Sequence, residues 1–153
     1  MKFHGELQWD LKELEKALKI GDQHILEYFR DGRRVSFVIE RRLAELLGGV
    51  LANSENSGYD IKDKKNRKWE VRSLTKKIYF CPSYMIGSGR SFTEEGFISK
   101  LKEIHGYIVA DVFQFPTVPY WMLEKDQILT WYNNNELGKN TNISRQKFLE
   151  LIK

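Results

Sequence analysis

The sequence predicts one α/β domain over residues 1–153, with a central mixed β-sheet flanked by helices and a helical N-terminal part. Three observations predict this class. Helical and strand patterns follow the order helix, strand, strand, strand, helix, strand, and further elements come after them. A near-continuous apolar run at residues 107–113 is typical of a central strand buried on both faces. At 153 residues, the chain is long enough for one domain with a sizeable core.

Helices are expected before the first strand. The first covers residues 10–20 with Asp10 as its N-cap, and the second covers residues 23–30. A third begins at Ser36 and ends at Gly48-Gly49. Its expected buried stripe consists of Phe37, Val38, Leu43, Leu46 and Leu47.

A β-hairpin is expected next, with strands at residues 59–63 and 67–73 around a turn at residues 64–66. In its second strand Trp69 and Val71 point to one face, and the polar residues between them point to the other. A third strand at residues 77–80 leads into a loop.

The second half of the chain begins with a helix. Ser91 and Glu94 form an expected capping box for this helix, which covers residues 92–104. The elements expected after it are strands at 107–113 and 118–123, a helix at 125–132, a polar loop at 133–143, and a last helix capped by Ser144.

The charge of the chain is mildly basic, at +4 with a pI of about 9.1. Eight basic residues lie between Lys62 and Lys77, against two acidic ones. A polyanion is the natural partner for such a stretch, although charge alone favours the alternative, a solvated hairpin with a lysine-rich tip.

Composition excludes several classes of protein. The single cysteine, Cys81, excludes an intramolecular disulfide and argues against a cysteine-built zinc site. No apolar run approaches the roughly 18 residues that cross a bilayer, and the N-terminus lacks a signal-peptide pattern. We therefore expect a cytoplasmic, reducing location without a membrane partner.

Three residues of the hairpin carry the chemical prediction. Glu70 and Arg72 are two apart on one strand and project from the same face, and pairing across the turn brings Asp60 near Glu70. Two carboxylates among basic residues suit Mg²⁺, which prefers hard oxygen ligands. A bound magnesium ion can activate water for phosphodiester hydrolysis. The alternative is that Asp60 ends a turn and Glu70 pairs with Arg72 or Lys68 on an exposed face of the sheet.

The pattern Asp60, nine intervening residues, then Glu70-Val71-Arg72 resembles the PD-(D/E)XK nuclease superfamily. Within it the chain looks most like small type II restriction endonucleases of the blunt-cutting Pvu type. The resemblance covers residues 36–113 as a catalytic core, with residues 114–153 as C-terminal additions. It implies a restriction-endonuclease-like fold and a Mg²⁺ cofactor, with Asp60 and Glu70 as metal ligands and Asp60, Glu70 and Arg72 as catalytic residues.

The sequence departs from the family at Arg72, where a lysine is usual. Arginine can position a phosphate but cannot act as a base, so Lys62 or Lys68 can stand in by strand parity. An acid from the preceding helix or loop sometimes joins the metal shell in this family. Of the three candidates Glu40, Glu45 and Glu55, position favours Glu40 as that metal ligand, although each is more often a solvated glutamate.

DNA contacts are expected from the loop after the third strand and from a later polar loop. The first combines hydroxyls, an aromatic ring and one arginine, and can equally be a simple connection. Asparagines in the second can pair with adenine, although each is more often a turn-former. The residues expected to contact DNA include the two hairpin lysines, and they are Lys62, Lys68, Ser83, Tyr84, Ser88, Arg90, Asn140 and Asn142.

The function that the resemblance implies is Mg²⁺-dependent, sequence-specific cleavage of double-stranded DNA. A palindromic target would require a homodimer, for which residues 10–31 are the expected contact. Two alternatives stay open: a non-cutting nucleic-acid binder on the same fold, and a structure-specific repair or junction nuclease.

Overall fold

The computed structural model describes residues 3–54 and 57–153 and has the α/β class that the sequence predicts. Six strands form one mixed sheet in the order β1-β7-β6-β4-β3-β2, in which only β4 and β6 run parallel. A second sheet pairs β5 with β8. The strands are β1 (Phe3–Gln8), β2 (Val50–Leu51), β3 (Ile61–Lys62), β4 (Lys68–Leu74), β5 (Lys77–Tyr79), β6 (Gly106–Asp111), β7 (Thr117–Glu124) and β8 (Asn142–Ser144).

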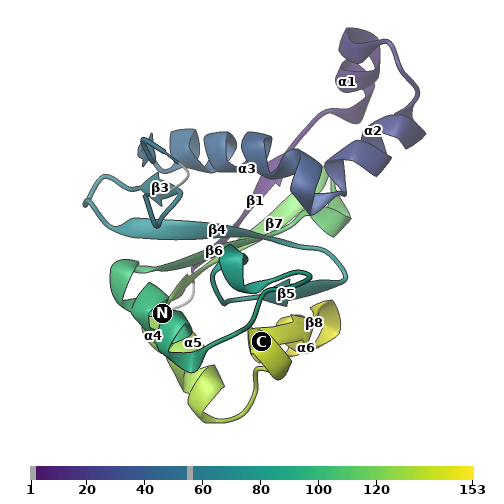
Figure 1. Ribbon diagram of the computed structural model, residues 1–153. Helices are drawn as coiled ribbons and strands as arrows, with labels where there is room; N and C mark the ends of the chain where they lie inside the picture. The colour runs from purple at the N-terminus through teal and green to yellow at the C-terminus, as the bar shows by residue number, and fades with distance from the viewer. Residues whose placement is uncertain (1–2, 55–56) are drawn as a thin grey trace.

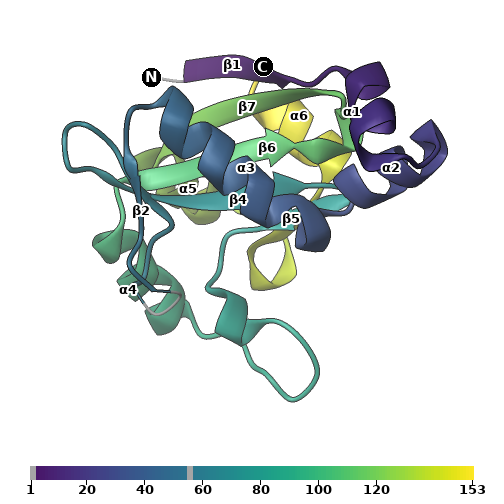
Figure 2. The ribbon, with the colours of Figure 1, turned by 90° about the horizontal axis from the view of Figure 1, so that it is seen from above.

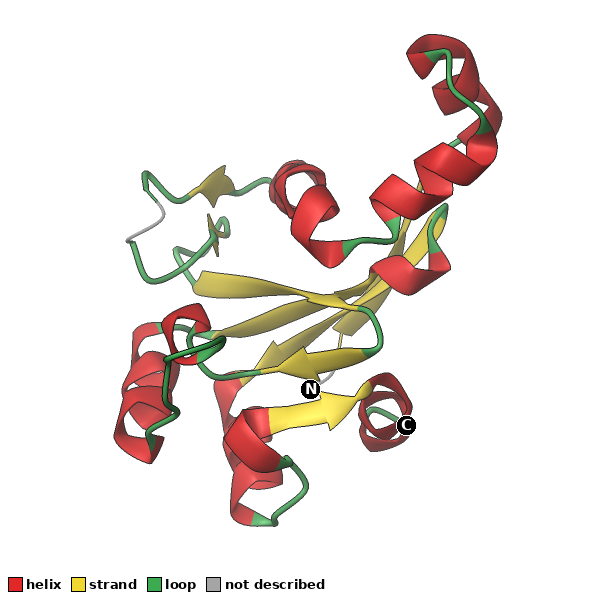
Figure 3. Ribbon diagram, turned by 45° about the vertical axis from the view of Figure 1, so that its right-hand side comes forward, coloured by secondary structure: helices red, strands yellow, loops and turns green. Residues whose placement is uncertain are grey.

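Helices cover both faces of the main sheet. Figure 1 shows α3 on one face and α4, α5 and α6 on the other, while α1 and α2 project beyond the end of the sheet. The same layering is visible in Figure 3, where the strands lie between two sets of helices. The α-helices are α1 (Leu11–Leu18), α2 (Asp22–Phe29), α3 (Gly32–Leu46), α4 (Glu94–Glu103), α5 (Lys125–Asn133) and α6 (Arg145–Leu151), and three 3-10 helices are η1 (Ser83–Met85), η2 (Val112–Gln114) and η3 (Lys139–Thr141).

Strand β6 divides the core into two halves. All six of its residues are buried, as its apolar sequence predicts. Ile108 and Ala110 pack into the cluster beneath α3, whereas Tyr107 and Val109 pack into the cluster beneath α4, α5 and α6. Alternate residues of a strand point to opposite faces, so one short strand supplies both halves.

Helix α3 begins four residues before the predicted cap Ser36. Asp31 is the N-cap, and its carboxylate accepts a hydrogen bond from the backbone N–H of Arg33 at 2.9 Å. The longer helix buries a row spaced by four, Val35, Ile39 and Leu43, because residues i and i+4 share a face. The predicted stripe is therefore wrong at Phe37 and Leu46, which are exposed.

The caps of two other helices also differ from the predictions. Thr93, not Ser91, caps α4, and its hydroxyl accepts from the N–H of Gly96 at 3.1 Å. Helix α1 ends at Lys19 in a left-handed conformation, so Gly21 becomes the N-cap of α2. By contrast, Asp10 and Ser144 cap α1 and α6 as predicted.

The sequence patterns missed three strands and misplaced one. Strand β1 carries little apolar sequence because it lies at the sheet edge beside β7, and β2 is only two residues long. The predicted third strand, β5, does not extend the main sheet but pairs with β8 from the loop expected to be polar. Gly5 of β1 is required by close packing, because an added Cβ would lie 2.6 Å from the hydroxyl of Tyr120.

Among the residues that the structure describes, no helix has the length and apolar character needed to cross a bilayer.

Candidate active site

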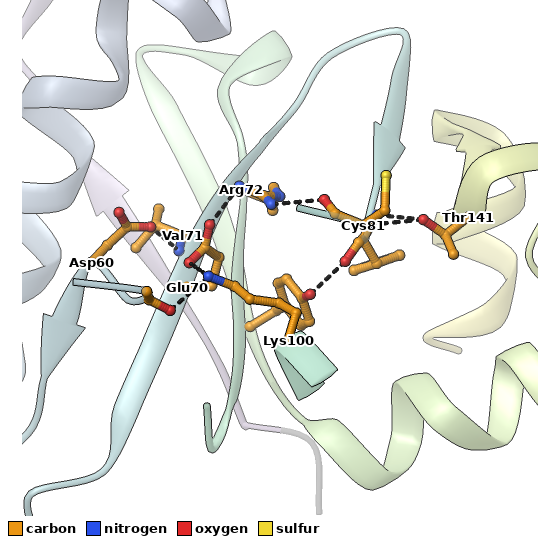
Figure 4. A network of polar contacts seen from close by, with 10 residues as sticks. Asp60, Glu70, Val71, Arg72, Cys81, Lys100 and Thr141 are labelled. Atoms are coloured by element: carbon orange, nitrogen blue, oxygen red, sulfur yellow. Dashed lines mark hydrogen bonds and ion pairs between the residues drawn. The ribbon is translucent and has the colours of Figure 1, made fainter. Parts of the chain in front are cut away.

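The hairpin of β3 and β4 brings the two predicted acids together. Its register pairs Ile61 with Trp69, which, extended by one residue, sets Asp60 opposite Glu70. The backbone N–H of Asp60 donates to the carbonyl of Trp69 at 2.9 Å and fixes this end of the hairpin. Figure 4 shows both carboxyl groups beside β4.

Glu70 is held by two cations from different elements. Its Oε1 accepts from Arg72 at 2.8 Å, and its Oε2 lies 2.9 Å from Nζ of Lys100 on α4. All three side chains are only 11% exposed. Lys100 also donates to the carbonyl of Gly58 at 2.6 Å, which ties α4 to the segment before Asp60. The parallel pairing of β4 with β6 and the helix between them therefore deliver a lysine to the acid pair.

Arg72 connects Glu70 to the start of the loop after β5. Its guanidinium donates to the carbonyl of Cys81 at 3.1 Å and lies 5.0 Å from the ring centre of Tyr79. Burial is the largest single influence on the pKa of Arg72 and lowers it, but Glu70, Tyr107, Tyr79 and Asp60 together outweigh burial and raise this pKa above its usual value. The buried Nε has no hydrogen-bond partner among the described residues. Arg72 is thus a fixed positive charge.

The backbone of Cys81, whose carbonyl accepts the hydrogen bond from Arg72, is itself held by Thr141. The hydroxyl of Thr141 accepts from the N–H of Cys81 at 2.8 Å and from that of Phe80 at 3.1 Å (Figure 4). Thr141 is buried and has a φ of 58°, a conformation that a β-branched residue rarely adopts. Thr141, far along the chain, thus fixes the start of the loop that is expected to contact DNA.

Asp60 has a less stabilised environment than Glu70. Its Oδ2 accepts from the backbone N–H of Val71 at 2.7 Å, which leaves Oδ1 outside that bond. Burial, and after it the charge of Glu70, raises the pKa of Asp60 to about 6, although the bond from Val71 lowers it. Two carboxylates that repel each other in a half-buried position are a suitable pair of ligands for a divalent cation.

The lysine at the acid pair is not one of the two that the sequence predicted. Lys62 and Lys68 pair across β3 and β4 and lie 5.6 and 5.3 Å above the ring of Tyr59. Lys100 contacts Glu70 instead. It was missed because it lies on a helix 30 positions later in sequence, and only the parallel β4–β6 pairing reveals its position.

Asp60, Glu70, Arg72 and Lys100 line an open cleft of about 1550 Å³. The cleft lies between the N-terminal half of α3, the strand β4 and the loop after β5. Figure 2 shows that loop extending away from the body on the side next to α3 and β5. Of the other predicted site residues, Glu40, Ser83, Tyr84, Arg90, Asn140 and Asn142 line the cleft, whereas Lys62, Lys68 and Ser88 are not among its lining residues. Arg90 donates to the carbonyls of Ser83 and Ile86 within its own loop.

A third acidic ligand is not assembled. The described residues contain no group of three or more His, Cys, Asp or Glu side chains placed to hold a metal ion. Glu40 lines the same cleft but does not form such a group with Asp60 and Glu70, and Glu55 lies outside the described residues. Magnesium commonly uses one or two carboxylates with waters and phosphate oxygens, so the acid pair alone fits it.

Asp111, the acid in the central strand, serves the fold. It is fully buried and accepts from Arg145 at 2.7 Å and from Gln114 at 2.7 Å. A buried carboxylate with a paired arginine satisfies its charge locally.

Comparison with protein-family models, with curated proteins and with solved structures finds no match. The function proposed below therefore rests on the geometry of the site.

Proposed function

We propose that the protein is a Mg²⁺-dependent endonuclease that hydrolyses phosphodiester bonds of double-stranded DNA, with Asp60 and Glu70 as metal ligands. The single observation that carries this proposal is the position of Glu70, opposite Asp60 and between Arg72 and Lys100, in a cleft open to solvent. Acids that bind a divalent ion, next to cations that stabilise a phosphate, are what this hydrolysis requires.

A magnesium ion bound between Asp60 and Glu70 would supply activation of water and stabilisation of charge on the phosphate. Lys100 holds the orientation of Glu70 and offers the one remaining N–H donor of its ammonium group to a water or phosphate oxygen, because the other two serve Glu70 and the carbonyl of Gly58. Arg72, charged at all working pH values, fixes the other oxygen of Glu70. Lys100 thus takes the role that the superfamily pattern gives to the lysine absent at position 72.

The order of elements around the site supports a restriction-endonuclease-like core. Helix α3, the hairpin of β3 and β4, strand β5, helix α4 and strand β6 occur in this order along residues 32–111, with the short strand β2 before the hairpin and η1 before α4. We propose that this unit is the nuclease core, and that the elements before and after it are additions specific to this chain.

We also propose that the protein acts as a homodimer through α1 and α2. Both helices project from the body, and α1 buries none of its residues (Figure 1). Leu18 and Ile20 are about half exposed near the tip of this projection. A second copy would cover them, and sedimentation equilibrium would test this, because Leu18→Glu should shift a dimer towards monomer.

Incubation with plasmid DNA and Mg²⁺ tests the proposed activity. We expect discrete fragments from the wild type and none from Asp60→Asn, which keeps an oxygen for the N–H of Val71 but loses the charge. Binding of the same DNA in EDTA should survive this change. A wild type that binds DNA but never cuts it with Mg²⁺ or Mn²⁺ would identify the protein as a non-cutting binder.

A further inference from the structure

The exposed apolar side chains divide by type between the cleft and the rest of the surface. Eight large hydrophobic residues of the described chain are exposed. Three of them line the cleft and all are aromatic: Phe37, Tyr84 and Phe113, at 61, 65 and 48% exposure. Of the five elsewhere, four are aliphatic, and they are Leu18, Ile20, Tyr28, Leu46 and Val50.

The three rings do not come from one local patch. Phe37 lies on α3, Tyr84 on η1 and Phe113 on η2, so three separate parts of the chain each place a ring at the same cleft. An aromatic side chain buries roughly 150–250 Å² when it is covered, and leaving it in water forgoes that stabilisation. Their shared position indicates a ligand with flat faces.

Cations accompany these rings. The guanidinium of Arg41 lies 3.2 Å from the centre of the Phe37 ring, and that of Arg145, which is paired with Asp111, lies 5.2 Å from the centre of Phe113. One face of each of these two rings is therefore covered by an arginine of the chain, which leaves the other face for a ligand. Lys76 and Lys77 line the cleft as well. Rings that stack on bases, alternating with cations that follow phosphates, are typical of surfaces that bind unpaired nucleotides.

We propose that the cleft binds DNA with one or more unpaired nucleotides beside the scissile phosphate, and that these bases stack on Phe37, Tyr84 and Phe113. In a fully paired duplex the faces of the bases are covered by their neighbours, so three exposed rings find no partner there. The inference rests on the proposed function, because it names the substrate class of the same site. It predicts that double-stranded DNA carrying a gap, a flap or a branch is bound more tightly than fully paired DNA.

Binding in EDTA tests this without cleavage. The probes are a fully paired duplex, the same duplex with a gap of two unpaired nucleotides carrying 2-aminopurine, and an RNA of the gapped sequence. We expect the gapped DNA to bind about tenfold more tightly than the duplex, with quenching of the 2-aminopurine fluorescence, since each stacked base contributes about 1–3 kcal/mol.

Ring-to-aliphatic variants separate stacking from simple hydrophobic contact. Phe37→Leu, Tyr84→Leu and Phe113→Leu should each weaken binding of the gapped DNA by about fivefold or more and reduce the quenching. Leu46→Ala is the control, because Leu46 is an exposed apolar residue on the same helix as Phe37 but does not line the cleft, and it should change neither. An unchanged melting temperature for each variant verifies folding.

Equal affinity for paired and gapped DNA, or full binding by the three leucine variants, would overturn the inference, as would a preference for the RNA. Its failure is distinguishable from that of the proposed function. If the protein cleaves fully paired duplex and the three leucine variants bind as the wild type does, the nuclease proposal stands and the stacking proposal fails. If binding depends on the three rings but no DNA is cleaved, the stacking proposal stands and the nuclease proposal fails.

Discussion

The pKa values of two aspartates on one hairpin, Asp60 and Asp63, are shifted in opposite directions. Asp63, at the turn, accepts four hydrogen bonds, from the N–H groups of Lys65 and Arg67 and from the side chains of Arg67 and Trp69. Burial alone would raise its pKa, but these bonds, above all that from Trp69, lower it to about 2. Asp60, at the open end, accepts one bond from Val71, and its pKa is raised to about 6.

The difference separates an acid that holds the hairpin from one that is available for a ligand. The turn acid has both oxygens committed within the chain, so its charge stabilises the fold. The cleft acid is buried and repelled by Glu70, and the bond from Val71 with the charges of Arg72 and Lys100 compensates this only in part, so its charge stays costly until a further cation arrives. Incomplete satisfaction of a half-buried carboxylate is therefore the sign of function here, as is common for groups with perturbed pKa values.

The largest effect that sharpens this contrast is expected at Lys100. Lys100→Met removes the cation from Glu70 and should lower DNA cleavage by about a hundredfold or more, because even groups that only position metal ligands cost 10–100-fold when changed. Initial rates on plasmid DNA measure this effect. Lys62→Met is the matched control and should cut at the wild-type rate. Slow cleavage by Lys62→Met together with wild-type cleavage by Lys100→Met would instead assign the catalytic role to the hairpin lysine.

The next effect is on stability. Asp63→Asn places an amide group among four donors and should lower the free energy of unfolding by roughly 2–3 kcal/mol, measured by urea denaturation. Asp60→Asn should leave stability unchanged or higher in EDTA, because it removes repulsion from Glu70 and keeps an acceptor for Val71. A loss at Asp60 as large as that at Asp63 would contradict the distinction between them.

The two acids should also affect stability in separate pH ranges in metal-free buffer. The pKa of Asp63 is lowered from 3.8, so its contribution is complete above pH 3.8 and is lost as pH falls towards 2. The pKa of Asp60 is raised, so its contribution is complete below pH 3.8 and is lost as pH rises through about 6. Urea midpoints of wild type and of the two asparagine variants from pH 2 to 8 measure both ranges. Overlapping ranges would show that the acids titrate together.

The smallest effect is expected at Arg67. Its side chain is 38% exposed, so the ion pair with Asp63 is partly screened by water. Arg67→Gln should cost less than about 1 kcal/mol in the same urea experiment. A cost equal to that of Asp63→Asn would mean that this one cation, and not the set of four bonds, stabilises the turn.

The sequence was sufficient for elements defined by local patterns. The alternation around Trp69 and Val71 predicted the hairpin, and the apolar run predicted β6 as the central strand. It failed where partners are distant along the chain: β1 contains too few apolar residues to be recognised without β7 beside it, and β5 pairs with β8.

The same limit applies to the candidate site. Asp60, Glu70 and Arg72 share a hairpin, so strand parity was enough to predict their proximity. Lys100 and Thr141 arrive from α4 and from the end of η3, and no spacing rule connects them to the hairpin. The set of three cleft-lining rings is equally invisible in sequence, since each ring belongs to a different element.

The span of chain from Asp60 to Lys100 has a consequence for protein synthesis. The acids emerge from the ribosome well before α4, and β4 cannot complete its pairing until β6 has followed. An unfinished or clipped copy therefore carries both carboxylates without the lysine and without the strand that supports them. Under the proposed function, such a copy lacks a complete catalytic site.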